Sequence, residues 1–244
     1  MTTILKLGGS VITDKDSPET VDEAALDRIA ATVAAAADDD LVLVHGGGSF
    51  GHHHANEYGV SRTRGTHDYE GVVAIHAAMK RLNDAVLDAF HAADVPAVPV
   101  HPFSAGFRNA VSDLVLPTGQ VRVLVREGFV PVVHGDVIAH EGRGATVVSG
   151  DELVVELADH LDADRVGLCS AVPGVYDEDG EVIERIESIE AVEAAVGGSE
   201  STDVTGGMAA KVRELLSLSV PAFVFELDDA ETFLAGGSPG TRIG

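Results

Sequence analysis

The chain has 244 residues, of which 45% are hydrophobic and 23% are charged, so it can bury the core of one large domain or of two lobes. Its longest apolar run is far shorter than the roughly 20 residues that cross a bilayer, and its single Cys169 excludes an internal disulfide and a cysteine-rich zinc module. The formal net charge of −24 repels polyanions, which excludes nucleic acids and anionic membranes as partners. With neither a signal-peptide nor a transit-peptide pattern at its start, we expect a cytoplasmic protein.

Lysine is scarce in this acidic chain. Of 16 basic residues, only four are lysines, namely Lys6, Lys15, Lys80 and Lys211. An acidic, lysine-poor surface suits a cytoplasm of high salt, where ions screen the self-repulsion. Three of the four lysines lie in or beside glycine-rich segments, so we expect these three to have a function.

Short apolar runs alternate with helical patterns along the chain. Several runs lack polar alternation, as expected for strands of a parallel sheet that is covered on both faces. The predicted strands are residues 3–7, 41–44, 95–100, 130–133, 165–169 and 221–225. The predicted helices are residues 26–33, 69–93, 150–161, 189–196 and 206–218, with a small hairpin at 175–182 and a polar loop at 197–203. This alternation predicts an α/β fold with a mainly parallel sheet and no internal repeat.

The first predicted strand ends in the sequence Lys6-Leu7-Gly8-Gly9-Ser10. Two glycines let the backbone approach a ligand closely, and their N–H groups can form a nest for an anion. Lys6 adds a cation beside this nest, and Lys15 follows. The alternative is an ordinary turn with a solvated lysine, but the scarcity of lysine favours a binding site.

A glycine loop, Gly46 to Gly51, follows the second predicted strand. It formally matches G-x-G-x-x-G, but a dinucleotide site also needs an acidic residue at the end of the next strand. Asp68 and Glu70 stand near the required distance, yet they precede or lie in a helical pattern. We therefore reject a dinucleotide site, and the lack of G-x-x-x-x-G-K-[ST] excludes a P-loop. The remaining interpretation is a glycine loop that opens a helix and binds a phosphate group.

Three histidines, His52 to His54, follow this loop. Consecutive residues on a helix point about 100° apart, so the three cannot converge on one ion, and we assign no metal site. His52 lies directly at the glycine loop, where it can donate a hydrogen bond to an anionic or hydroxyl group. We expect His53 and His54 to be surface or packing residues.

Two further segments carry candidate residues. Asp136 follows a predicted strand, which is where ligands bind in α/β sheets, and Ser149-Gly150-Asp151 opens a helix. Asp151 either complements the helix dipole or organises the lysines, and the two roles are compatible. In 205–211, two glycines start a helix one turn before Lys211. This pattern predicts a second phosphate cradle, with a plain helix start after an exposed loop as the alternative.

The motifs KLGGS, GGGSFGH, GD, SGD and TGGMAAK stand in this order and resemble the amino-acid kinase superfamily over essentially the whole chain. The His after GGGSFG, together with ITDK, is most similar to its isopentenyl phosphate kinase branch, and fosfomycin kinase shares that His. One departure is that Ala171 and Pro173 stand where the superfamily commonly has aspartates. The resemblance implies a three-layer α/β sandwich with a mainly parallel central sheet, formed by a single domain of residues 1–244. It also implies an acceptor-binding lobe of about residues 1–160, a nucleotide-binding lobe of about 161–244, a homodimer and a halophilic archaeon as source.

The resemblance further implies ATP-dependent phosphorylation of isopentenyl phosphate, a small prenyl monophosphate. A fosfomycin-kinase-like enzyme and a non-catalytic nucleotide-binding storage or regulatory protein are the alternatives. Mg²⁺ would be held mainly by the nucleotide phosphates.

The roles that follow fall on side chains and backbone groups of the motifs. Lys6 and Lys211 would hold phosphate oxygens, and Asp151 would orient the lysines. Lys15 would stabilise the transition state, and His52 would hydrogen-bond the acceptor phosphate. The expected ATP-binding residues are Lys6, Gly8, Gly9, Ser10, Gly48, Gly206, Gly207 and Lys211. The expected acceptor-binding residues are Gly47, Gly48, His52, Asp136 and Gly150, with Val72, Ile75 and Met79 as an apolar wall.

Overall fold

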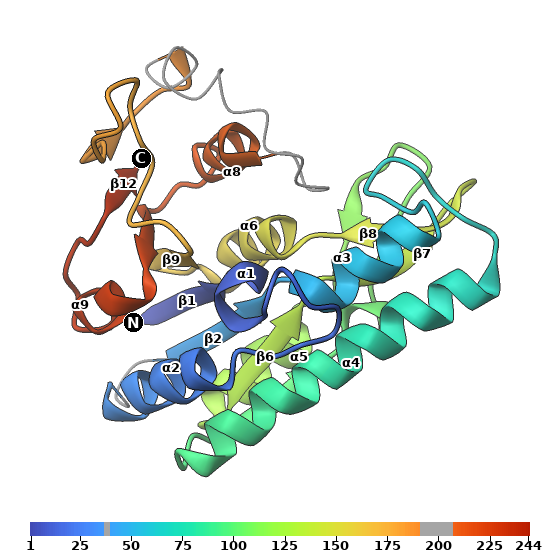
Figure 1. Cartoon of the computed structure of the whole chain (residues 1–244), viewed down its shortest axis with the longest axis horizontal. Coiled ribbons are helices and arrows are strands. Elements are labelled where there is room, and N and C mark those ends of the chain that lie inside the picture. Colours follow the sequence, from blue (N-terminus) through green and yellow to red (C-terminus); the bar gives the residue numbers. More distant parts are fainter. Residues whose placement is uncertain (37–39, 191–206) are drawn as a thin grey trace.

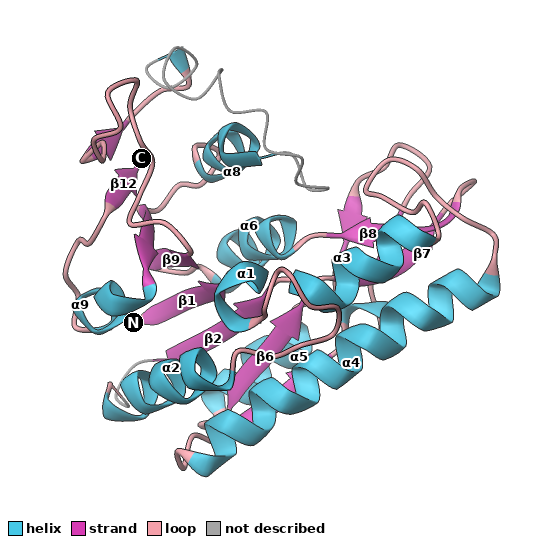
Figure 2. Cartoon of the chain, viewed as in Figure 1, coloured by secondary structure: helices cyan, strands magenta, loops and turns pink. Residues whose placement is uncertain are grey.

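The computed structural model describes residues 1–36, 40–190 and 207–244. An eight-stranded sheet runs through it with helices on both faces, and a smaller four-stranded sheet adjoins it (Figures 1 and 2). The order in the large sheet is β10-β12-β11-β9-β1-β2-β6-β3. Its strands are β1 (Thr2–Leu7), β2 (Asp40–His45), β3 (Ala97–Val100), β6 (Val130–His134), β9 (Arg165–Ser170), β10 (Arg185–Ile186), β11 (Ala222–Glu226) and β12 (Thr241–Ile243).

The large sheet is parallel except where β12 pairs antiparallel with β11. All six predicted strands belong to this sheet, which confirms the prediction of a mainly parallel sheet. Their apolar runs were visible in the sequence because both faces of the sheet are buried. Strand β1 shows this, since Ile4 packs into one core while its neighbour Leu5 packs into the other.

Helices cover the two faces and complete the predicted three-layer sandwich. One core lies against α5, α6 and α8, and the other lies against α2, α3, α4 and α9. The helices are α1 (Gly9–Ile12), α2 (Glu23–Ala35), α3 (Gly48–Glu57), α4 (Tyr69–Ala92), α5 (Gly119–Arg126), α6 (Gly150–Leu161), α8 (Gly207–Leu215) and α9 (Ala230–Leu234), with short 3₁₀ turns at Pro102–Ser104 and Leu227–Asp229. None of the helices in the described ranges is both long and apolar enough to cross a membrane.

The four-stranded sheet was not predicted. Its order is β5-β4-β7-β8, formed by β4 (Phe107–Arg108), β5 (Leu114–Val115), β7 (Asp136–His140) and β8 (Gly144–Val148). Strands β7 and β8 form an antiparallel hairpin in which Asp136 pairs with Val148. Because β7 begins just after β6 ends and β8 ends just before α6, this hairpin brings Asp136 next to the start of α6.

The smaller predictions have mixed outcomes. Residues 175–182 contain an antiparallel bridge between Tyr176 and Val182, as the predicted hairpin requires. Strand β3 starts at Ala97 rather than at 95, and α8 ends at Leu215 rather than at 218. The predicted loop at 197–203 and nearly all of the predicted helix at 189–196 lie outside the described residues.

Candidate active site

A cavity of about 690 Å³ lies at the carboxyl ends of the central strands. Its walls come from the segments that follow β1, β2 and β6, and Ser170 at the end of β9 also lines it. Ligands of open α/β sheets bind at this edge. The sequence motifs therefore meet here because the strands that precede them lie side by side in one parallel sheet.

The two glycine segments after β1 and β2 pack backbone against backbone. A Cβ on Gly9 would lie 2.2 Å from the nitrogen of Gly48, and Gly48 itself has a φ of +47°. A side chain at Gly9 would force the two loops apart, and L-residues rarely adopt the conformation of Gly48. Glycine is therefore required for this contact, which leaves only backbone between the two loops.

Helices α3 and α6 both begin at this cavity, at Gly48 and Gly150. The first N–H groups of a helix have no intrahelical partner and carry partial positive charge, which favours an anion. The start of α6 is fixed by a capping box, in which the Ser149 hydroxyl accepts from the Glu152 N–H at 3.1 Å and the Glu152 carboxylate accepts from the Ser149 N–H at 3.0 Å.

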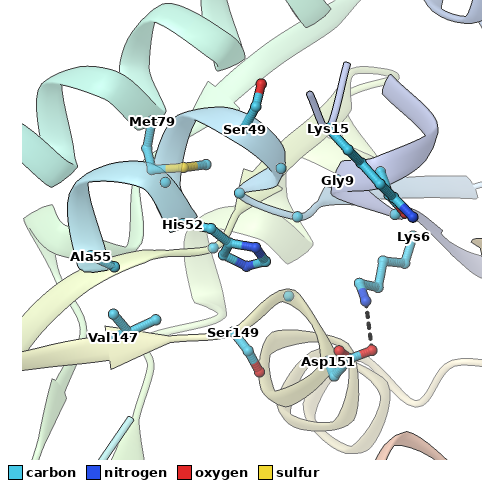
Figure 3. A pocket seen from close by; sticks show the side chains of 18 of the residues that line it. Lys6, Gly9, Lys15, Ser49, His52, Ala55, Met79, Val147, Ser149 and Asp151 are labelled. Carbon is cyan, nitrogen blue, oxygen red and sulfur yellow. Dashed lines mark hydrogen bonds and ion pairs between the residues drawn. The ribbon is translucent and has the colours of Figure 1, made fainter. Parts of the chain in front are cut away.

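Lys6, Lys15 and Lys211 all line the cavity, as the scarcity of lysine predicted. The Nζ atom of Lys6 donates to Oδ1 of Asp151 at 2.5 Å, and both side chains are buried (Figure 3). Burial alone would raise the pKa of Asp151, but attraction by Lys6 and then by Lys211 outweighs it, so the pKa lies below its ordinary value. Asp151 therefore keeps its negative charge between two lysines, as expected of a residue that organises them.

Two buried histidines hold the peptides at the strand ends. His45 ends β2 and His134 ends β6, and the two are register partners with stacked rings. In each, the Nδ1 atom lies within hydrogen-bond distance of the carbonyl oxygen of the next residue, at 3.0 Å for Gly46 and 2.9 Å for Gly135. A carbonyl can only accept, so Nδ1 carries the proton in both rings. A trans peptide directs its N–H opposite to its C=O, so His45 fixes the direction of the Gly47 N–H at the glycine loop.

The three consecutive histidines lie in different surroundings. The ring of His52 lines the cavity and lies between the lysines and the apolar side chains in Figure 3. His53 is exposed at the cavity rim, and His54 is half-buried with its nitrogens 2.6 Å from Glu19 and 3.2 Å from Glu57. Ligand atoms of His53, His54 and Glu57 lie within 4.8 Å of one another, as a metal site would require. Both ring nitrogens of His54, however, are within hydrogen-bond distance of carboxylates, those of Glu19 and Glu57.

The end of the cavity beyond His52 is apolar. Ile75 and Met79 line it as predicted, together with Ala55 and Val147, which the sequence did not single out. The predicted Val72 is not among the lining residues; it is half-buried and packs against the small core cluster that includes Ala55 and Ile75. Val72 lies three residues before Ile75 on nearly the same face of α4, so it stands at a different position along the helix axis rather than on another face.

The sequence did not indicate Arg62 as a cavity residue, nor did it indicate the partner of the predicted Asp136. Arg62 lines the cavity, with its Nε atom 3.0 Å from Glu152 and its guanidinium paired with Glu214 of α8. It stands in a loop whose sequence carries no motif. The predicted Asp136 accepts a hydrogen bond from His76 Nδ1 at 2.8 Å, and this partner had not been indicated by the sequence. Burial raises the pKa of Asp136 despite this contact.

The remaining predicted residues line the cavity as well, with two exceptions. These lining residues are Gly8, Gly9, Ser10, Gly47, Gly48, Asp136 and Gly150. Gly206 lies outside the described residues, and Gly207 is the first residue of α8.

The comparisons with known proteins agree with this geometry. Residues 1–222 match the amino acid kinase family. An isopentenyl phosphate kinase from Haloferax volcanii is 62% identical over 241 residues, which cover 98% of this chain and 97% of the relative. Another, from Methanocaldococcus jannaschii, is 35% identical and covers 100% of this chain and 98% of the relative.

Solved structures give the same result. An X-ray structure of isopentenyl phosphate kinase superposes with a TM-score of 0.87 at 32% identity, covering 100% of both chains. A product complex of the Thermoplasma acidophilum isopentenyl phosphate kinase superposes with a TM-score of 0.81 at 25% identity, again over 100% of both chains. The chain belongs to the amino acid kinase family and, within it, to the isopentenyl phosphate kinases.

Proposed function

We propose that this chain transfers the γ-phosphate of ATP to isopentenyl phosphate, which gives isopentenyl diphosphate and ADP. The observation that carries this proposal is the division of one cavity into two ends. Three lysines and two helix N-termini form a strongly cationic end, while Ala55, Ile75, Met79 and Val147 form an apolar end. A monophosphate with a short branched hydrocarbon tail has the same division.

The transfer joins two anions, so the chain's main work is to position them and to neutralise charge. An oxygen of the acceptor phosphate attacks the γ-phosphorus, and the bond from that phosphorus to the β-phosphate oxygen breaks, with its electrons leaving on ADP. The acceptor phosphate is largely ionised near neutral pH because its second pKa is about 6. No general base is therefore needed.

Each of these groups has a distinct role in the transfer. Lys6 and Lys211 hold oxygens of the transferring and β-phosphates, and Asp151 between them fixes the ammonium of Lys6. Lys15 neutralises the charge that develops near the γ-phosphate. His52 donates a hydrogen bond to the acceptor phosphate, and the N–H groups of Gly47 and Gly48 at the start of α3 contact the same group.

The donor set of the cavity bears on how Mg²⁺ would be held. Asp151 is paired with Lys6, and Asp136 accepts from His76 and from the Val137 N–H. Carboxylates engaged in this way are poor ligands for a metal that requires several unshared oxygens. We therefore expect Mg²⁺ to be carried by the nucleotide phosphates, whose charge it neutralises when bound.

The order of strands supports two lobes. One half of the large sheet, with the spatial order β1-β2-β6-β3, is formed by strands from residues 1–160. The other half, with the order β10-β12-β11-β9, is formed by strands from residues 161–244. Lys6 is the last residue but one of β1 and pairs in register with Leu168 of β9, at the boundary between the expected acceptor-binding and nucleotide-binding lobes. Transfer between two substrates at such a boundary would let each lobe bind one of them.

Three broader properties belong to the same proposal. A homodimer is supported by exposed apolar side chains gathered within 103–129, namely Phe103, Phe107, Val111, Val115, Val123 and Phe129. A halophilic source is supported by the net charge of −24 and by the Haloferax relative. A cytoplasmic location is consistent with the dependence of the enzyme on ATP.

A panel of acceptors tests the proposed function. The enzyme is incubated in molar KCl with MgATP and isopentenyl phosphate, dimethylallyl phosphate, fosfomycin or UMP, and products are identified by ³¹P NMR. We expect the highest kcat/KM with isopentenyl phosphate. A preference for fosfomycin would instead identify a fosfomycin-kinase-like enzyme, and no turnover of any acceptor would favour a storage or regulatory protein.

A further inference from the structure

The loop that carries Lys15 is closed at its base. Thr13 and Val21 form an antiparallel bridge, and the Asp14 N–H donates to the Thr20 carbonyl at 2.9 Å. Lys15 follows immediately, is exposed, and makes no hydrogen bond or ion pair with any other residue in the described ranges. A lysine side chain has many rotamers, so the position of its ammonium depends on where the loop backbone is held.

Glu19 joins this loop to the two helices beside it. Its carboxylate accepts from Arg81 of α4 through Nε at 3.0 Å and through Nη2 at 2.6 and 2.7 Å, a two-pronged contact. The same carboxylate lies 2.6 Å from Nε2 of His54 on α3. One side chain therefore connects the loop to both helices that form the acceptor side of the cavity.

The backbone around Glu19 adds two contacts with the start of α3. The Glu19 N–H donates to the Ser49 carbonyl at 3.2 Å, and the Thr20 N–H donates to the Ser49 hydroxyl at 3.3 Å. Glu19 has a φ of +49°, which is costly for a residue other than glycine. A strained backbone persists where its surroundings hold it, and here the carboxylate contacts provide that hold.

The charges in this cluster support a lasting contact. Hydrogen bonds from Arg81 and then from His54 lower the pKa of Glu19 below its ordinary value, so the carboxylate is ionised at neutral pH. Only 29% of the Glu19 side chain is exposed, which reduces screening by salt relative to an open surface pair. The Arg81 side chain is 51% exposed, so we expect high salt to weaken this pair less than a fully exposed pair but more than a buried one.

We propose that Glu19 is a positioning residue that holds the Lys15 loop against α3 and α4 and thereby places the Lys15 ammonium in the cavity. The proposal rests on the proposed function, because it assigns the work of Lys15 to phosphoryl transfer. It also gives His54 a role distinct from that of His52. The His54 side chain leaves α3 toward the loop, whereas His52 faces the cavity.

A double-mutant cycle tests whether Glu19 acts through Lys15. Glu19→Gln and Arg81→Ala are each made alone and in a Lys15→Ala background, and kcat and both KM values are measured with MgATP and isopentenyl phosphate. We expect each single change to lower kcat by about threefold to tenfold, with both KM values within about twofold. In the Lys15→Ala background we expect no further loss of kcat. The matched control is Glu57→Gln, which removes the other carboxylate at His54 without touching the loop and should leave kcat unchanged.

Hydrogen exchange provides a readout that does not depend on turnover. Amides of residues 14–20 should exchange faster in Glu19→Gln and in Arg81→Ala than in the parent protein and in Glu57→Gln, at equal thermal stability. If Glu19→Gln folds poorly, Arg81→Ala and His54→Gln break the same contacts from the helix side.

The outcomes separate the two proposals. Unchanged exchange in the loop, an unchanged kcat, an equal loss of kcat in the Lys15→Ala background, or a Lys15→Ala variant with parental kcat would each overturn the positioning role. Faster exchange in a protein that turns over no isopentenyl phosphate would leave the loop contact standing and refute the proposed function instead.

Discussion

The ammonium of Lys6 lies 2.5 Å from the carboxylate of Asp151, although 145 residues separate them in the chain. Both side chains are buried, so each ion depends on the other for compensation. Strand β1 delivers Lys6 and the first turn of α6 delivers Asp151, and these two elements pack against each other. Any substitution at one position therefore changes the electrostatic state of the other.

We predict that Asp151→Asn destabilises the fold by about 3–5 kcal/mol at neutral pH, because it leaves a buried ammonium without its counter-ion. The folded-state pKa of Asp151 lies below its ordinary 3.8. The contribution of the pair is therefore complete above the ordinary pKa and is lost as the pH falls below 3.8 through the lower folded-state value. Urea unfolding of both proteins from pH 7 to pH 3 in constant KCl should show their stabilities converging toward acid. A Lys6→Met, Asp151→Asn double variant should be less destabilised than Asp151→Asn alone.

The sequence predicted the main sheet and the phosphate-binding motifs for the same physical reason. Strands buried on both faces read as continuous apolar runs, and a parallel sheet brings their carboxyl ends to one edge. The motifs at the ends of such strands, from Lys6 to Asp136, had to meet once the sheet was assigned. Lysine scarcity in an acidic chain then drew attention to Lys6, Lys15 and Lys211, which all line the cavity.

What the sequence did not predict depends on contacts between distant segments. Strands β4 and β5 have two residues each, which is too short for any periodicity. Arg62 and Glu19 stand in loops and acquire their roles only through partners on distant helices. Val72 belongs to the same apolar stripe as Ile75, and a stripe alone does not tell which residues face a cavity and which face the core.

His45 should make stability depend on pH at less acidic values than Asp151 does, between pH 6.5 and about pH 4. Burial lowers the pKa of His45 from 6.5 to about 4, so between these two pH values the His45 ring stays neutral in the folded protein but binds a proton in the unfolded chain. Stability is therefore complete above pH 6.5 and falls as the pH drops toward 4, by about 3 kcal/mol for this group. His45→Asn keeps a donor for the Gly46 carbonyl but cannot titrate, so its unfolding free energy should fall less over this interval. Parallel stability curves for the two proteins would contradict the assignment.

His52 should govern recognition of the acceptor. Replacing it with alanine removes a hydrogen bond to a charged phosphate, so kcat/KM for isopentenyl phosphate should fall by at least about tenfold, with KM for ATP little changed. The matched control is His53→Ala, because His53 is the next residue on the same helix and is exposed at the rim. Equal losses in both variants, or a loss in His53→Ala alone, would show that the assignment is wrong.

Salt should raise both stability and activity. With a net charge of −24, self-repulsion is poorly screened in dilute buffer, where the Debye length is about 30 Å at 0.01 M and shrinks to about 3 Å at 1 M. The thermal unfolding midpoint should therefore rise between dilute buffer and molar KCl, and kcat/KM for isopentenyl phosphate should rise with it. Potassium sulfate and potassium chloride at equal ionic strength separate screening from general salting-out effects. An unchanged or falling midpoint would remove the argument for adaptation to salt.

Met79 should limit the length of the acceptor tail. Its side chain is buried in the core and also lines the apolar end of the cavity, where a Cβ on Gly51 would lie 2.6 Å from its sulfur. Shortening it to alanine both removes core packing and opens space beyond the tail. Met79→Ala should therefore lose about 2–5 kcal/mol of stability and should raise the ratio of kcat/KM for geranyl phosphate to that for isopentenyl phosphate.

Leu82 on the same helix separates these two effects, because it is fully buried in the same core but does not line the cavity. Leu82→Ala should lose stability to a similar extent while leaving the ratio for the two acceptors at its parental value. Both variants are compared by urea unfolding and by turnover of the two phosphates in molar KCl. A destabilised Met79→Ala with the parental ratio would show that Met79 acts only as a core residue and that the acceptor tail ends before reaching it.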